Sequence, residues 1–242
     1  RKTVNGQMET LEQPERGCWV NVVSPDAAEQ QWLRESLGIV PEFVQSALDD
    51  EERSHTDFDD DTRQVLVIVD CPSVEEKAEA EDPSIVQYDT HPLSVLFLPE
   101  NDCIVTVSLQ LNETMQAFTD GTVRDISTQQ RTRLLLRIFL NISQRYQVYL
   151  RNINRQFNKS EHTLHENTSN TELKKMLGLQ KSLVYFSTSL KADEATLAKI
   201  NAGRLVNLYE DDRDLLEDVV IEIRQAVEMC TIYTGILTST KD

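Results

Sequence analysis

Three stretches in the second half of the chain carry apolar residues spaced alternately three and four positions apart, and this repeat constrains the fold most. Such spacing places each set on one narrow face of a helix, so it predicts three long helices that pack like a coiled coil, within the chain or between chains. Asp193 interrupts the second repeat once. The repeats are Leu135, Phe139, Ile142, Tyr146, Tyr149 and Ile153; Met176, Leu179, Leu183, Phe186, Leu190, Leu197 and Ile200; and Leu216, Val219, Ile223, Ala226, Cys230, Tyr233 and Leu237.

Local signals set the expected ends of these helices. The patterns Ser-x-x-Gln at 127–130 and Ser-x-x-Glu at 169–172 are capping boxes, which open helices. A polar stretch at 159–170 predicts a break between the first two helices, and the acidic cluster at 210–212 precedes the third. We expect the first two helices to be antiparallel, and the third to lead outward with its stripe under-buried.

The first half reads differently, as short strands alternating with short helices. Residues 65–69 are a run of β-branched and apolar side chains, and 19–23, 93–98 and 103–107 are similar. A further strand is expected around 85–88, after an exposed acidic loop at 73–83. Ser24-Pro25-Asp26 predicts a helix that stops at Gly38, and Pro41 opens another.

The predicted fold class is therefore α/β (α+β): a mixed β-sheet flanked by helices, followed by a long-helix, coiled-coil-like stalk region. We expect two domains, an α/β sheet domain at 1–125 and a helical domain at 126–242. The helical domain would hold two antiparallel helices and the start of a stalk helix.

Charge and apolar content limit the classes of function. The chain carries a net charge of −17, and residues 42–82 alone hold fifteen acidic and three basic side chains. Such a polyanion repels nucleic acid. The longest strongly apolar window, Leu134 to Leu140, is interrupted by Arg137 and is far shorter than the ~20 residues of a membrane span. The four cysteines, Cys18, Cys71, Cys103 and Cys230, show no C-x-x-C spacing, which favours buried reduced thiols.

Catalytic patterns are scarce, so an enzyme is the weakest interpretation. The sequence has no Gly-rich phosphate loop, no G-x-S-x-G and no H-E-x-x-H. His162 and His165 have a spacing that would hold a metal with Glu166 on a helix, but an exposed polar turn is the favoured interpretation. Asp218 and Glu222 share one helix face. They form either a solvated face or a site for a hard cation such as Mg²⁺.

The order of these elements resembles the CorA family of divalent-cation channels. Gly-Cys-Trp-Val-Asn-Val-Val-Ser-Pro at 17–25 is similar to that family's opening pattern G-x-W-[IV]-[DN]-L-x-x-P, and a helix ending at Leu37-Gly38-Ile39 follows. The strand pair at 92–98 and 101–107 resembles the family's hairpin V-x-x-F-L … L-V-T-V. Two antiparallel helices and a last long helix complete the resemblance, which covers essentially the whole chain.

The resemblance implies that the chain is the cytoplasmic regulatory part of a magnesium channel in the cell membrane. Transmembrane helices would follow the last helix and attach it to the membrane. The resemblance also implies a homopentamer in which Mg²⁺ (or Co²⁺, Ni²⁺ or Zn²⁺) binds between neighbouring chains and holds the channel closed. One ligand would be Asp218, with Glu222 beside it, and the others would come from a loop at about 75–82, with Glu75 and Glu76 as candidates.

Two alternatives remain open from sequence. One is a zinc transporter of the same family, although the lack of a Cys/His cluster disfavours a site for a soft metal. The other is a coiled-coil interaction protein with no transport role, which would explain the helices but not the strands.

Overall fold

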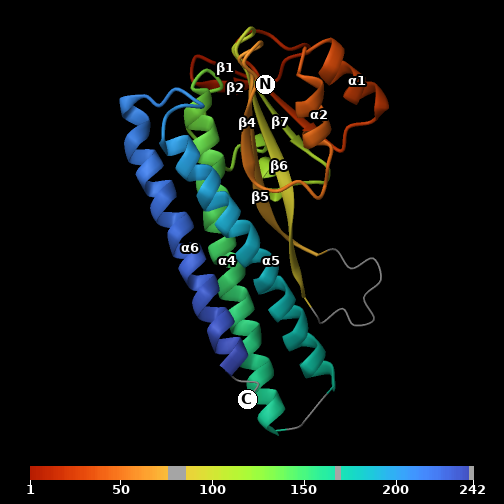
Figure 1. The fold of residues 1–242 in the computed structure, drawn as a ribbon, viewed down its shortest axis with the longest axis vertical. Coiled ribbons are helices and arrows are strands. Elements are labelled where there is room, and N and C mark those ends of the chain that lie inside the picture. Colours follow the sequence, from red (N-terminus) through yellow and green to blue (C-terminus); the bar gives the residue numbers. More distant parts are fainter. Residues whose placement is uncertain (76–85, 167–169, 240–242) are drawn as a thin grey trace.

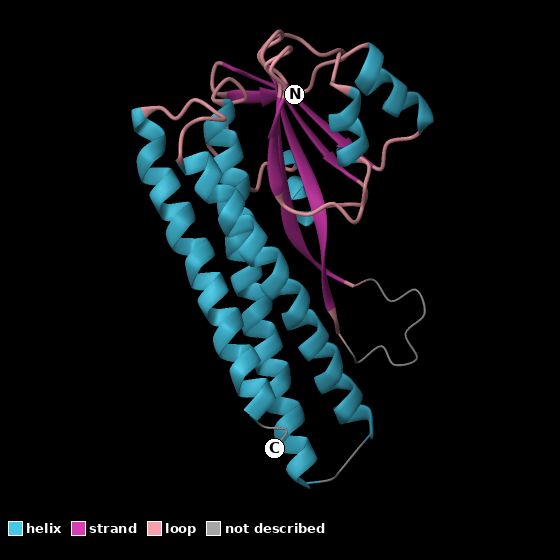
Figure 2. Ribbon diagram, viewed as in Figure 1, coloured by secondary structure: helices cyan, strands magenta, loops and turns pink. Residues whose placement is uncertain are grey.

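A five-stranded sheet and a bundle of long helices lie side by side in the computed structural model, which describes residues 1–75, 86–166 and 170–239 (Figures 1 and 2). The strands follow the order β3-β7-β6-β5-β4, and β3 and β7 are parallel while the other neighbours are antiparallel. The predicted mixed sheet is thus confirmed. Its strands are β3 (Trp19–Val23), β4 (His55–Phe58), β5 (Val65–Val74), β6 (Tyr88–Leu98) and β7 (Cys103–Ser108).

A small hairpin precedes the sheet and was not predicted. Its strands, β1 (Lys2–Val4) and β2 (Gln7–Glu9), are joined by Asn5 and Gly6. Both turn residues have positive φ, 50° and 80°, as a two-residue hairpin turn requires. Thr3 exchanges hydrogen bonds of 3.0 Å with Thr128, so the hairpin is fastened to the segment that precedes the first long helix.

β5 and β6 are longer than the sequence predicted. The separate strands expected around 85–88 and at 93–98 are wrong, because β6 runs without interruption from Tyr88 to Leu98. The loop expected from 73 begins later, since β5 continues through Val74; residues 76–83 of that prediction lie outside the described part. Pro72 and Pro92 suit these strands because each lies where its strand has one neighbour: β4 pairs with β5 only to Ile68, and β7 with β6 only to Leu93.

Two short helices, α1 (Ala27–Glu35) and α2 (Pro41–Ala47), cover one face of the sheet. The cap of α1 differs from the prediction. Asp26, not Ser24, is the N-cap: its carboxylate accepts from the Glu29 amide at 2.8 Å, and Glu29 accepts from the Asp26 amide at 2.9 Å. Ser24 instead donates its hydroxyl to the Leu109 carbonyl at 2.6 Å. The helix ends at Glu35, three residues before Gly38.

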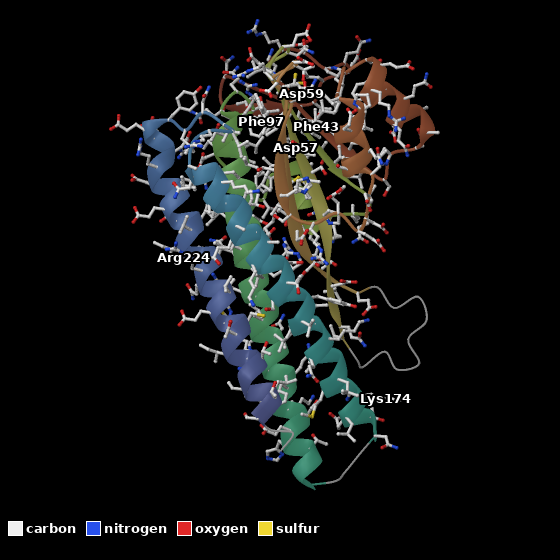
Figure 3. The ribbon with its side chains drawn as sticks, viewed as in Figure 1. Phe43, Asp57, Asp59, Phe97, Lys174 and Arg224 are labelled. Atoms are coloured by element: carbon white, nitrogen blue, oxygen red, sulfur yellow. The ribbon has the colours of Figure 1, made fainter. Side chains whose placement is uncertain are left out.

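The two faces of the sheet belong to different cores. Along β5, Val65, Val67 and Val69 pack toward the long helices, while Leu66 and Ile68 pack toward α1 and α2. Figure 3 labels Phe97 on the side of the long helices and Phe43 on the side of α2. The core on the helical side is continuous from the sheet through the whole bundle. The division into two domains at 125/126 therefore stays a prediction.

The helices of the second half are α3 (Glu113–Thr119), α4 (Arg131–Glu166), α5 (Asn170–Asn201), the 3₁₀ turn η1 (Glu210–Asp212) and α6 (Arg213–Ser239). α3 was not predicted. α4 begins later than the capping box suggested and continues through most of the expected polar break. The residues at 159–166 are polar apart from Leu164 and include no Gly or Pro, so nothing there stops a helix that is already formed.

α6 lies along the bundle and does not lead outward, so that prediction is wrong. α4 and α6 run in the same direction and α5 runs opposite to them (Figure 1). The α6 stripe from Leu216 to Leu237, expected to be under-buried, is buried on α4 and α5 apart from the partly buried Tyr233. The apolar stripe of α6 is thus buried by helices of the same chain.

Candidate functional site

Asp218 and Glu222 lie near the start of α6, outside its buried stripe. The Asp218 side chain is exposed and makes no hydrogen bond or ion pair to the described residues. Glu222 is half-buried and already has a partner, because Gln147 of α4 donates its side-chain amide to both the carboxylate and, at 3.0 Å, the carbonyl of Glu222. Of the two, Asp218 is therefore the better placed to take a ligand from outside the chain.

Glu75 directly follows β5 and is also exposed. Its amide donates to the Gln87 carbonyl at 2.9 Å, which extends the pairing of β5 with β6 by one residue. Its carboxylate lies near Lys181 of α5, where a hydrogen bond with Tyr185 and, to a smaller degree, the charge of Glu75 raise the pKa of the lysine. Glu76 lies outside the described residues.

One chain does not bring these acidic groups together. In Figure 1, α6 is at the left of the bundle and the far ends of β5 and β6 are at the right, with α4 and α5 between them. Within residues 1–75, 86–166 and 170–239, no three His, Cys, Asp or Glu side chains are grouped so that they could hold a metal ion. A cation that joins Asp218 to Glu75 would therefore have to lie between two copies of the chain.

The histidine pair of the sequence is on a helix, contrary to the favoured turn. His162 is exposed in the last part of α4, which continues to Glu166. The side chains of His165 and Glu166 lie outside the described part.

A second pair of carboxyl groups, which the sequence did not assign, is buried where β5 meets α5. Asp193 of α5 is fully buried and accepts a hydrogen bond of 2.8 Å from the Asp70 amide through one oxygen. Its other oxygen, Oδ2, makes no hydrogen bond to a described residue. Burial raises the pKa of Asp193 well above its usual value, and the nearby Asp70 carboxyl raises it further.

Asp70 has its own polar surroundings. Burial raises its pKa to about 6, while a hydrogen bond with Ser189 and the charge of Arg53 act in the opposite direction. The Tyr146 hydroxyl donates to the Asp70 carbonyl at 3.0 Å. Both carboxyl groups are buried where the sheet meets the bundle, and burial favours the protonated form of each. The signal in the sequence was Asp193, the one interruption of its apolar repeat.

None of the helices in the described part has an apolar stretch long enough to cross a membrane. Residues 14–242 match the family model described as CorA-like Mg2+ transporter protein. The chain belongs to the CorA family.

Similarity to individual CorA proteins extends over almost the whole chain. The cobalt/magnesium transport protein CorA of Methanocaldococcus jannaschii is 25% identical over 236 residues, which cover 94% of this chain and 68% of that protein. The structure of the soluble domain of CorA from the same organism superposes with a TM-score of 0.80 at 25% identity, covering 93% of this chain and 86% of that one.

A more distant likeness concerns the fold alone. The ZntB cytoplasmic domain from Vibrio parahaemolyticus superposes with a TM-score of 0.70 at 14% identity, over 93% of this chain and 84% of that one. The CorA fold is thus shared by proteins of different name.

Proposed function

We propose that this chain is the cytoplasmic regulatory part of a magnesium channel, in which divalent cations bound between neighbouring copies favour the closed state. The observation that carries the proposal is that two exposed acidic residues belong to elements on opposite sides of the bundle: Asp218 is on α6, and Glu75 follows the far end of β5. Membership of the CorA family and the similarity to a cobalt/magnesium transport protein support the choice of a divalent cation.

The geometry of the two groups favours a ring. When two different patches on opposite sides of a protein bind each other in successive copies, the contact is heterologous, and it closes into a ring if the rotation permits. The proposed pentamer is such a ring. Exposed apolar residues on the outer surface of α6, namely Ile221, Ile232 and Ile236, add a surface suited to packing against neighbouring copies.

Carboxylates and water form the ligand shell that Mg²⁺ prefers, and Mg²⁺ commonly keeps several waters while binding one or two carboxylates. Asp218, with Glu222 beside it, would supply one side of the site and Glu75 and Glu76 of the neighbour the other. The acidic face at Asp214, Asp218 and Glu222 has like charges four residues apart, which repel until a cation binds. Removal of Mg²⁺ would restore the repulsion and drive neighbouring chains apart, which couples binding to opening.

The zinc-transporter alternative has less support. Zn²⁺ favours His and Cys ligands, and the groups brought forward here are carboxylates. The likeness to the ZntB domain rests on fold at 14% identity.

The decisive experiment measures Mg²⁺-dependent closure of the full-length channel with Asp218→Ala and Asp218→Lys. We expect Asp218→Ala to shift the Mg²⁺ concentration for half-closure upward by about tenfold, which corresponds to the loss of about 1.4 kcal/mol of coupling. Asp218→Lys should favour closure without Mg²⁺, because the fixed positive charge replaces the cation.

Glu217→Ala is the matched control. Glu217 is the neighbouring exposed residue on α6, carries the same charge, and lines a groove with the α5–α6 connection instead. It should leave the Mg²⁺ response unchanged. If Asp218→Ala and Glu217→Ala respond to Mg²⁺ alike, Asp218 is not a ligand and the proposed site is wrong.

A further inference from the structure

Two cysteines that are 85 positions apart in the chain meet at the start of the parallel strand pair β3 and β7. Trp19 pairs with Ile104, so Cys18 and Cys103, which precede them, are directly opposite each other. Their sulfur atoms are 3.3 Å apart and both side chains are buried. Neighbouring strands are about 4.8 Å apart, which is within the range of Cα separations that a disulfide can bridge.

The surrounding backbone fixes both thiols. The Cys18 amide donates to the Glu15 carbonyl at 3.1 Å, and the Gly17 amide donates to the Asn101 carbonyl at 3.1 Å. The same two carbonyl oxygens lie 3.2 and 3.3 Å from the Cys103 sulfur and accept its proton when both thiols are protonated. The two sulfur atoms therefore stay within reach of each other without any rearrangement of the strands.

A small pocket reaches one member of this pair, Cys103. It has a volume of about 210 Å³ and is lined by Cys103 together with Glu15, Arg16, Trp32 and Asn101. A water molecule takes about 30 Å³ in the liquid, so the pocket has room for a molecule the size of hydrogen peroxide. Bulky oxidants have no comparable approach, because both side chains are about 1% exposed.

Electrostatics favour a reaction at Cys103. The hydrogen bond from the Cys18 thiol lowers the pKa of Cys103 to about 6, with help from the charge of Arg131, and the same bond raises the pKa of Cys18. The pair therefore loses a first proton readily and a second one with difficulty. The other two cysteines are isolated: burial raises the pKa of Cys71, and it raises that of Cys230 to about 11.

We propose that Cys18 and Cys103 form a peroxide-sensitive thiol pair, with Cys103 as the attacking residue and Cys18 as the resolving residue. The Cys103 thiolate attacks one oxygen of hydrogen peroxide, the O–O bond breaks, and a sulfenic acid and hydroxide form. The Cys18 sulfur then attacks the Cys103 sulfur, the S–O bond breaks, and a disulfide and water form. Two thiols are oxidised, one peroxide is reduced, and the two thiol protons end in the two waters.

The test treats the folded chain with a small molar excess of hydrogen peroxide. Free thiols are then alkylated in denaturant, and the digested protein is mapped by mass spectrometry. We expect a linked peptide containing Cys18 and Cys103, lighter by two hydrogen atoms than the sum of its parts and separated by dithiothreitol. Cys71 and Cys230 should be recovered alkylated.

Matched variants assign the roles. Cys230→Ser should leave the linked peptide unchanged. Cys18→Ser should abolish it and leave a Cys103 sulfenic acid that dimedone captures. The wild-type map decides even if Cys18→Ser does not fold. Recovery of Cys18 and Cys103 as alkylated thiols to the same extent as Cys71 and Cys230 overturns the proposal, and so does oxidation of Cys103 without a link to Cys18.

Discussion

At the scale of single residues, the Asp70–Asp193 pair sets a pH dependence with a definite sign. Both carboxyl groups have raised pKa values, Asp70 to about 6 and Asp193 well above its usual range, because folding buries them. The native state therefore binds protons more tightly than the unfolded state. Stability from this pair is full below about pH 4 and is lost as the pH rises through the folded pKa values.

We expect Asp193→Asn to stabilise the chain at about pH 7.5 by on the order of 1–3 kcal/mol and to flatten the dependence of stability on pH. Asparagine still accepts the Asp70 amide through its oxygen, and it cannot ionise. Urea unfolding at about pH 5 and about pH 7.5 measures both effects.

Glu194→Gln on the same helix is the control for this prediction. Glu194 is partly exposed and pairs with Arg224 at 3.6 Å, so its removal should change stability little at either pH. A stability of Asp193→Asn that falls at both pH values would show that the carboxylate is favourable in the folded state.

At the scale of elements, α6 depends on its buried stripe and not on its outer surface. Ile223 is 1% exposed against α4 and α5, whereas Ile221 on the same helix is 54% exposed. We expect Ile223→Ala to lower the free energy of unfolding by about 2–4 kcal/mol, because it leaves a cavity in the bundle core. Ile221→Ala makes the same chemical change and should cost less than about 1 kcal/mol. Denaturant unfolding of both variants compares them, and equal losses would contradict the packing of α6 described here.

The elements also show which parts of the fold the sequence could predict. β-Branched runs predicted the centres of β5 and β7, because those side chains are buried on both faces of the sheet. The extension of β5 and β6 past Pro72 and Pro92 was not predictable in this way, because it depends on where the outer neighbours stop. The heptad repeat of α6 predicted a buried face, but not that its own bundle would bury it. The pair Asn5-Gly6 is typical of a two-residue hairpin turn, and it joins β1 to β2.

The candidate site divides similarly. Sequence located Asp218 and Glu222 on one helix face, and the structure places them there. The sequence did not show that Gln147 donates a hydrogen bond to Glu222, since that contact joins positions 75 residues apart. Asp193 interrupts an apolar repeat and was therefore visible in the sequence, whereas Asp70 directly follows the apolar run 65–69 of β5 and breaks no repeat.

At the scale of the whole molecule, the sheet and the bundle share one core. Trp19 and the apolar face of β5 belong to the same buried cluster as the stripes of α4, α5 and α6. We therefore expect a single cooperative unfolding transition. Both tryptophans, Trp19 and Trp32, lie in the first half, so their fluorescence follows the sheet, while helical circular dichroism follows mainly the second half. Coincident midpoints are the expected result, and two separated midpoints would establish independent domains.

The length of α4 has a mechanical consequence. Its 36 residues span about 54 Å. The sheet contacts this helix past its middle, since Tyr88 of β6 packs on Tyr149 with ring centres 4.9 Å apart, and the last part of α6 lies beside the far part of α4 (Figure 1). A helix of this length that tilts by about 5° about one end moves its other end by about 5 Å, roughly the rise of one helical turn. A small change of angle where α4 meets the sheet would therefore become a displacement of a full turn at the far end of the bundle.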